Sequence, residues 1–467
     1  MTLYLSEEKY RDKVYGCWLG KNAGGTLGEP LEKRFGQEEM FNVDWYPELP
    51  EEGLPNDDLE IQLIWLQALQ EKGPGLTARD LVEYWLDCIC YNFDEYGLHK
   101  TNLKKGLMPP VSGWYNNWFK NCMGSPIRSE IWACVAPGAP EVAARYAFED
   151  SICDHAGGES VHGEIFNAVV ESAAFLIEDK FDLIEIGLNA IPEDSLTHQT
   201  VTKTLDLYNK GVDWKKARNI ILDEFYNPIA QFSPINLAFQ TIGWLYGKDF
   251  GNAICKAVNC GWDTDCTGAT LGAILGIVHG ADNLPDKWME PLGTEISTNV
   301  RTGGITNLEA PTDIAELTDE VCNMGKKVLN YWNSDINISD ANIEENITEK
   351  INPRVFTSSF NFEKHLDYKA STLEFDLDTI EVDLEYKNTP AVIGNKATPF
   401  SVAINNPHPE SLSLQVDIDL PDNWSLQTEA PTVFELGADS KIKLNYKVTA
   451  DENNIEMRNE GLIKIKV

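Results

Sequence analysis

Two aspartates near the middle of the chain are the residues with the clearest chemical use. Asp263 and Asp265 lie two positions apart, between Gly261 and a run of small residues that begins at Gly268. The small residues predict a tightly packed helix, with both carboxylates at its entrance. Hard divalent cations such as Mg²⁺ and Mn²⁺ prefer carboxylate and carbonyl oxygens. This stretch therefore predicts one half of a metal site, and the other half must come from elsewhere in the chain.

A second pair of carboxylates, Asp57 and Asp58, follows Asn56 at the predicted start of another helix. Such residues often do no more than cap a helix, but two adjacent carboxylates held by an apolar helix are also a candidate half-site. If this pair met Asp263 and Asp265, the four carboxylates would repel one another unless cations neutralised them. Two metal ions about 3.5 to 4 Å apart would suit that ligand set, and would hold a water and neighbouring hydroxyl groups.

A glycine-rich run from Gly16 to Glu32 precedes both half-sites. Glycine recurs there at nearly every fourth position, which allows close helix packing and then a backbone turn near a ligand. Glu29 and Glu32 fall where that turn would deliver an acid, so both are candidate catalytic carboxylates. A surface glutamate after a helix end is the alternative for either one.

Between residues 92 and 135 the helical periodicity fails, and glycine, proline and aromatic residues dominate. Long loops in compact domains are often functional, so Trp114 and Trp118 are candidates to stack on a base or a sugar ring, with plain packing as the alternative. Further along, His155 follows Asp154 at a glycine break. This histidine is a candidate for the edge of a site, although a single histidine is more often structural.

Length, composition and charge limit the class of protein. A chain of 467 residues is too long for one ordinary domain, and no apolar run is long enough to predict a membrane-spanning helix. The net charge of −36 argues against nucleic acid as a ligand. Ten cysteines without paired metal-type spacing predict reduced thiols, and the N-terminus has no signal pattern. We therefore expect a cytoplasmic protein with neither nucleic-acid nor membrane partners.

The periodicity divides the chain into three parts. Helical patterns predict an all-α bundle over residues 1–334, and residues 335–352 are polar and predict a linker. Short alternating runs separated by turns then predict an antiparallel β-sandwich over residues 353–467. Around residues 420–425 this part resembles the immunoglobulin-like modules appended to glycosidases.

Residues 7 to 332 resemble the ADP-ribosylglycohydrolase family, which includes the dinitrogenase reductase-activating glycohydrolases. The segment Gly28-Glu29-Pro30-Leu31-Glu32 is similar to the family's G-x-P-x-E, and Asn56-Asp57-Asp58 stands where the family has T-D-D. Asp150 and His155 keep the spacing of its D-x-x-x-x-H stretch. Asp263-Thr264-Asp265-Cys266 matches D-T-D-T and, with the small-residue helix that follows, is the most specific of these motifs.

This resemblance implies an all-α bundle with a dinuclear magnesium, or manganese, centre that binds ribose hydroxyls. The implied metal-ligand positions are Asn56, Asp57, Asp58, Asp263, Asp265 and Cys266. Glu32 would act as acid and base while water attacks the anomeric carbon, and Glu29 is the reserve candidate. Cleavage of a ribosyl bond passes through an oxocarbenium-like state, which needs a positioned water, a carboxylate and fixed hydroxyls.

Three positions depart from the family pattern, and one of them is Gly25, which stands where many members carry an aspartate. Asn56 replaces a threonine, and its amide oxygen can still bind a hard cation. Cys266 replaces the closing threonine, and a thiol is a poor magnesium ligand. One metal would then be lost, be bound through water, or be exchanged for a softer ion such as manganese.

The sequence therefore predicts a metal-dependent hydrolase of a ribosyl N- or O-glycosidic bond, acting on an ADP-ribosyl-protein or a related ADP-ribose conjugate. In that case Ser125 and Arg128 are candidates to bind the diphosphate. Free nucleosides or other small glycosides are alternative substrates. A non-catalytic ADP-ribose- or sugar-binding protein is a second hypothesis, and assembly through the C-terminal sandwich is a third. The leaving group and the oligomeric state stay open.

Overall fold

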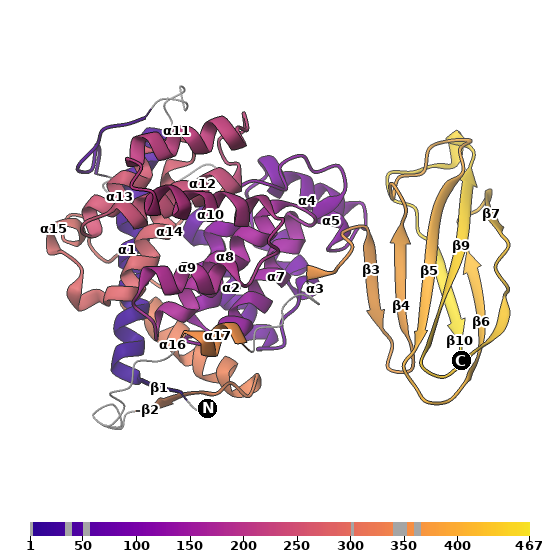
Figure 1. Cartoon of the computed structure of the whole chain (residues 1–467). Helices are drawn as coiled ribbons and strands as arrows, with labels where there is room; N and C mark the ends of the chain where they lie inside the picture. Colours follow the sequence, from indigo (N-terminus) through magenta and orange to yellow (C-terminus); the bar gives the residue numbers. More distant parts are fainter. Residues whose placement is uncertain (1–2, 33–39, 50–56, 300–302, 340–352, 359–365) are drawn as a thin grey trace.

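The computed structural model describes residues 3–32, 40–49, 57–299, 303–339, 353–358 and 366–467. Figure 1 shows a large helical body followed by a smaller body made of strands. This order confirms the predicted fold class, an all-α bundle before antiparallel sheets. The predicted metal ligand Asn56 lies outside the described residues.

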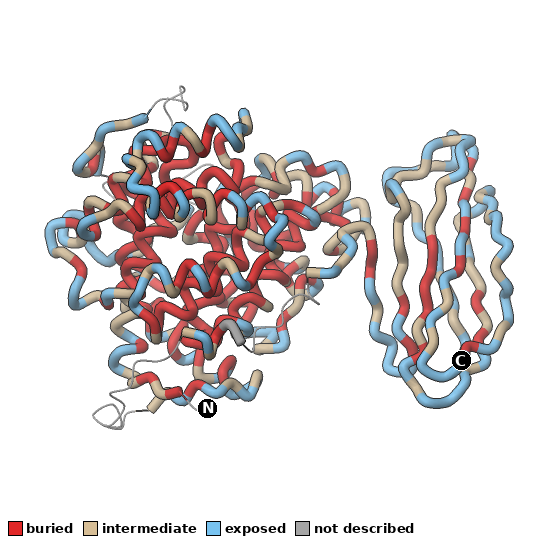
Figure 2. The backbone as a smooth tube through the Cα atoms, in the orientation of Figure 1, coloured by how far each residue is buried: buried red, intermediate tan, exposed pale blue. Residues whose placement is uncertain are grey.

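The helical body is built from many helices of moderate length around a long first helix. Their bounds are α1 (Glu7–Glu32), α2 (Asp57–Lys72), α3 (Ala78–Asp87), α4 (Asp94–Lys104), α5 (Val111–Trp114), α6 (Ser129–Cys134), α7 (Pro140–Asp154), α8 (Glu159–Ala174), α9 (Lys180–Leu188), α10 (Leu196–Asn209), α11 (Trp214–Phe225), α12 (Ser233–Tyr246), α13 (Phe250–Asn259), α14 (Thr264–His279), α15 (Asp286–Met289), α16 (Ile314–Tyr331) and α17 (Arg354–Ser358). Figure 2 shows that most of the chain inside this body is buried, and its apolar side chains form one large core cluster and a smaller one that includes residues of α11 and α12.

The closest helix pair in this body is α1 with α14, which run antiparallel. Along their contact, four glycines of α1 face small residues of α14: Gly16 with Gly276, Gly20 with Gly272, Gly24 with Gly268, and Gly28 with Thr264. A Cβ atom added to Gly24 would lie 1.8 Å from the carbonyl oxygen of Gly268, so only glycine permits this approach. The contact places the end of α1 beside the start of α14.

A short parallel strand pair closes the helical body near the N-terminus. Strand β1 (Leu3–Ser6) pairs with β2 (Ile336–Ser339), with Leu3 opposite Ile336. The predicted linker, residues 335–352, thus opens with a strand of the helical body, while residues 340–352 lie outside the described part. Phe356 on α17 is buried in the helical core, so the region predicted as sandwich also begins with residues that pack on the helices.

The strands after residue 371 form two antiparallel sheets packed face to face. One sheet has the order β3-β4-β5-β9-β7 and the other β10-β6-β8. The bounds are β3 (Thr372–Asp376), β4 (Glu381–Tyr386), β5 (Thr398–Asn406), β6 (Leu412–Asp419), β7 (Trp424–Thr428), β8 (Val433–Leu436), β9 (Ser440–Ala450) and β10 (Leu462–Lys466). Val402 and Leu444 of the first sheet share a core with Leu414 and Val416 of the second. The finer likeness to immunoglobulin modules stays a prediction.

Side chains from residues 366–375 connect this sandwich to the helices. The hydroxyl of Tyr368 accepts a hydrogen bond from the backbone N–H of Gly157 at 2.7 Å, and its ring packs edge-on against Phe148. The guanidinium of Arg79 lies 4.6 Å from the ring centre of Phe375. The segment before β3 therefore packs on the surface of the helical body, and Phe375 within β3 also contacts it.

The sequence predicts reduced cysteines and no membrane-spanning helix. All ten cysteines are free thiols, as the sequence predicts. Among the described residues, no helix combines the length and the apolar character needed to cross a membrane.

Candidate active site

The glycine contact between α1 and α14 gathers three carboxylates from distant parts of the chain. Glu32 ends α1, Asp263 is the residue before α14, and Asp265 is in the first turn of that helix. One oxygen from each carboxylate lies within 4.8 Å of the other two. The hydroxyl of Thr264 also donates to the carbonyl of Gly28 at 2.8 Å, which ties the two helix ends together.

The turn before α14 sets the direction of Asp263. Gly261 and Trp262 both have positive φ angles, 82° and 62°, so the chain reverses sharply before the aspartate. The backbone N–H of Asp263 then donates to the amide oxygen of Asn236 at 3.2 Å. A non-glycine residue in this conformation is uncommon, and here it lies immediately before the carboxylate cluster.

The second predicted half-site joins the first through Asp265. Ligand atoms of Asp58, Asp265 and Cys266 also lie within 4.8 Å of one another, and Asp58 is 1% exposed. Asp265 is thus common to an all-oxygen group of three and to a group that includes a sulfur. Neighbouring Asp57 belongs to neither group, and its Oδ2 accepts a hydrogen bond from Tyr96 at 3.0 Å.

Burial and mutual repulsion dominate the electrostatics of this cluster. Burial raises the pKa of Asp263 well above its usual value, and the Asp265 and Glu32 carboxylates raise it further. Burial and the Glu32 carboxylate raise the pKa of Asp265 to about 7. Both carboxylate oxygens of Asp263 are buried, and among the described residues no N–H or O–H donor pairs with them, the Cys266 thiol being a weak donor nearby. Such an arrangement fits a bound cation, because a cation would offset the cost of burying the ionised form.

The structure separates the two predicted catalytic glutamates. Glu32 is half-buried and lies within the carboxylate cluster, so it can act on a substrate held there or bind a cation itself. Glu29 is half-buried on α1 and belongs to neither ligand group within the described residues. The assignment of the acid and base to either glutamate stays a prediction.

A buried ion pair beneath the cluster was not found by sequence reasoning. The ammonium group of Lys21 lies 2.8 Å from Glu130, whose other oxygen accepts from Gln62 at 2.9 Å. Burial lowers the pKa of Lys21, but the carboxylates of Glu130 and Asp58 outweigh it and raise that pKa overall. The signal in the sequence was a single lysine inside a run of glycines and small residues. The Lys21 ammonium group places a fixed positive charge near Asp58.

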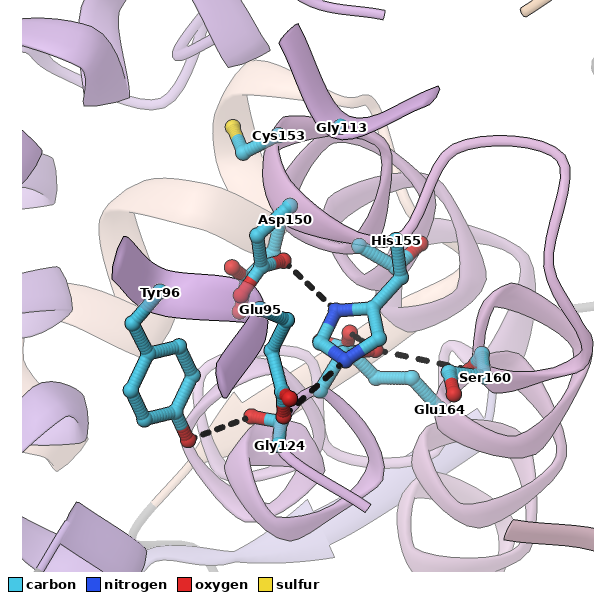
Figure 3. Close-up of polar contacts among 12 residues, drawn as sticks. Glu95, Tyr96, Gly113, Gly124, Asp150, Cys153, His155, Ser160 and Glu164 are labelled. Carbon is cyan, nitrogen blue, oxygen red and sulfur yellow. Dashed lines mark hydrogen bonds and ion pairs between the residues drawn. The ribbon is translucent and has the colours of Figure 1, made fainter. Parts of the chain in front are cut away.

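A second buried polar cluster surrounds His155 (Figure 3). Its Nδ1 lies 2.8 Å from Asp154, and its Nε2 lies 3.4 Å from Glu95. Burial lowers the pKa of His155, but Asp154 and Glu95 together raise it to about 9. Tyr96, next to Glu95, donates to Asp57, so the two clusters are adjacent.

The predicted diphosphate-binding residues have protein partners in this structure. Arg128 is fully buried and binds Asp150 at 2.8 Å and Asp154 at 3.0 Å. The hydroxyl of Ser125, also fully buried, donates to Glu164 at 2.6 Å. Their contact with a diphosphate stays a prediction, since any such ligand would have to compete with these carboxylates.

The two predicted stacking tryptophans lie in different surroundings. Trp118 is 60% exposed, with its ring 5.9 Å from that of Phe119. Trp114 is partly buried and packs against the helical core. Only Trp118 therefore presents much of its ring to solvent, and its role toward a substrate stays a prediction.

Comparison with known proteins shows the family of this chain. An uncharacterized protein of Archaeoglobus fulgidus is 25% identical over 298 residues, which cover 61% of this chain and 92% of that protein. A solved structure described as an ADP-ribosylglycohydrolase-related protein complex matches 69% of this chain and 99% of its own, with 17% identity and a TM-score of 0.39. The profile of the ADP-ribosylglycohydrolase family matches residues 6–326. The chain therefore belongs to the ADP-ribosylglycohydrolase family.

Proposed function

We propose that this protein is a metal-dependent hydrolase that cleaves a ribosyl N- or O-glycosidic bond of an ADP-ribosyl-protein or a related ADP-ribose conjugate. Family membership supports the glycosidic hydrolase class. The observation that carries the proposal is the group formed by Glu32, Asp263 and Asp265, whose oxygens lie within 4.8 Å of one another. A buried group of this kind is costly to maintain unless it serves a cation or a reaction.

The residues at the site fit divalent cations of the magnesium or manganese type. Carboxylate oxygens are the ligands that such cations prefer, and Asp263 and Asp265 would hold one of them, with the Glu32 carboxylate beside it. A second position would use Asp58, the shared Asp265 and Cys266. When bound, the cations supply fixed positive charge that holds ribose hydroxyls and a water.

The chain's own residues supply the remaining chemistry. A carboxylate at Glu32 can accept a proton from a water near the anomeric carbon and return one to the leaving group. Asp263 and Asp265 would keep the cations, and through them the ribose hydroxyls, in a fixed position while the bond breaks. Burial of Asp263 and Asp265 keeps bulk water away from these charges, which strengthens their effect.

One observation favours the second candidate, a hydrolase of free nucleosides or other small glycosides. The guanidinium of Arg128 is already bound to Asp150, Asp154 and the carbonyl of Gly124, at 2.6 Å for the last. A substrate without a diphosphate would need no help from this side chain. A screen should therefore include nucleosides beside ADP-ribosyl substrates.

The test is a substrate screen with magnesium and with manganese, comparing the wild-type protein with Asp263→Asn. We expect the variant to lose at least about 100-fold in turnover, because it removes charge from the centre of the cluster. Asp422→Asn, at an exposed position of the sandwich, is the matched control and should keep wild-type turnover. Unchanged turnover in Asp263→Asn would refute the site, and binding of ADP-ribose without hydrolysis would favour the non-catalytic hypothesis.

A further inference from the structure

Cys266 is the one residue of the carboxylate cluster that offers a sulfur ligand. Its Sγ lies within 4.8 Å of ligand oxygens of Asp58 and Asp265. Within the described residues, no other cysteine takes part in a comparable group of potential metal ligands. The cluster therefore contains two unlike positions, one with oxygens only and one with two oxygens and a sulfur.

The local backbone holds Cys266 in this place. The residue is in the first turn of α14, between the buried Asp265 and Thr267, and is itself half-buried. Its backbone N–H donates to Oδ1 of Asp265 at 2.9 Å. The same turn of helix thus orients the shared carboxylate and the thiol, and both depend on the packing of α14 against α1.

A separate observation points to a cation beside the thiol. Asp263 is 1% exposed, and among the described residues no N–H or O–H donor pairs with its carboxylate oxygens, which face the Cys266 thiol. It belongs to the all-oxygen group that shares Asp265 with Cys266. A buried carboxylate without an N–H or O–H donor is costly to ionise, because the charge loses its hydration. A bound cation or a proton compensates that cost.

We propose that the position formed by Asp58, Asp265 and Cys266 binds a thiophilic divalent cation of the zinc class in preference to magnesium. Thiolate sulfur selects such ions, whereas carboxylate oxygens alone suit magnesium and manganese. On binding, the Cys266 S–H bond breaks, its proton leaves to solvent, and a sulfur–metal bond forms without any change of oxidation state. This inference rests on the metal site of the proposed function and assigns different metals to its two positions.

The first experiment uses Co²⁺ as a spectroscopic substitute for Zn²⁺ in the full-length protein after chelator treatment. We expect a thiolate-to-cobalt charge-transfer band in the wild type and none in Cys266→Ser. Calorimetry should show proton release with Zn²⁺, and an affinity for Zn²⁺ that falls in Cys266→Ser by at least the ~10- to 100-fold typical of losing a residue that only supports a metal ligand. Affinity for Mg²⁺ should be unchanged.

The second experiment uses the chain's own exposed thiol as an internal control. Alkylation by iodoacetamide is read by peptide mass spectrometry in the presence of Zn²⁺ or Mg²⁺. Zn²⁺ should protect Cys266 from alkylation while Mg²⁺ does not, and the exposed Cys90 should react equally in both. Cys90→Ser should keep the cobalt band.

The outcomes separate this inference from the proposed function. A cobalt band or zinc affinity that is the same in a folded Cys266→Ser variant, with circular dichroism as the folding check, overturns the inference and leaves the hydrolase proposal intact. Equal protection by Mg²⁺ and Zn²⁺ overturns it as well. A cobalt band that depends on Cys266, in a protein that hydrolyses no ribosyl substrate, supports the inference and refutes the proposed activity.

Discussion

At the scale of single residues, the site is defined by charges that the fold buries close together. Asp263 lies among carboxylates with no N–H or O–H donor to its oxygens in the described part of the chain, whereas Lys21 is paired with Glu130. His155 is charged because Asp154 and Glu95 outweigh its burial. The pKa of each of these groups is shifted by its neighbours, and the shift at His155 falls in a pH range where unfolding can be measured.

His155 predicts a loss of stability at alkaline pH. Its pKa is raised from 6.5 to about 9, so the charged histidine stabilises the fold fully below about pH 6.5 and loses that contribution as the pH rises through 9. The contribution is up to about 3 kcal/mol by the usual conversion of pKa to free energy. The free energy of unfolding in urea should be lower at pH 9 than at pH 6 in the wild type. The decrease should be smaller in His155→Gln. Equal falls in both proteins would contradict the assignment.

At the scale of elements, the contact between α1 and α14 is what creates the site. The glycines at intervals of four residues let the backbones touch, and the end of one helix then meets the start of the other. The sequence indicated close packing on each helix separately. The structure adds that the two glycine series face each other, so the same contact that stabilises the core also brings Glu32 to Asp263 and Asp265.

Gly24→Ala should therefore damage both stability and activity. In an exposed helix this change would stabilise by up to about 1 kcal/mol, but here the new Cβ would lie 1.8 Å from a carbonyl oxygen of α14. We expect the helices to be forced apart at a cost of about 1 to 3 kcal/mol or more, as in overpacked cores. Thermal unfolding and turnover are the measurements. Gly437→Ala, whose new Cβ would make an ordinary 3.5 Å contact, is the control and should change neither.

At the scale of the whole molecule, the C-terminal part is joined to the helical body by more than its linker. Phe356 is buried in the helical core, and Leu366, Tyr368 and Ala370 pack against it. Tyr368 also bonds to Gly157, two residues after His155. The sandwich proper begins only at β3, so residues 353–371 are better described as part of the helical body.

Two truncations test this division of the chain. A protein that ends at residue 371 should unfold at a higher temperature than one that ends at residue 339, because the shorter chain exposes the core surface under Phe356 and Tyr368. The free energies of unfolding of the two proteins should differ by a few kcal/mol, at about 1.5 to 3 kcal/mol for each large apolar side chain removed. Differential scanning calorimetry of both chains checks this, and identical transition temperatures would contradict it. Size-exclusion chromatography of the same proteins tests assembly through the sandwich.

The sequence by itself determined the helical domain, the strands that follow it, and the two aspartate pairs as features of helix starts. These conclusions rest on local periodicity and on helix-end chemistry, which a short stretch of chain carries on its own. Only the tertiary structure decided which helix ends meet. It placed Glu32 with Asp263 and Asp265, made Asp265 common to two ligand groups, and bound Arg128 to Asp150 and Asp154. Contacts such as that of Glu32 with Asp263, more than 200 positions apart, depend on how whole helices pack, and no local pattern encodes them.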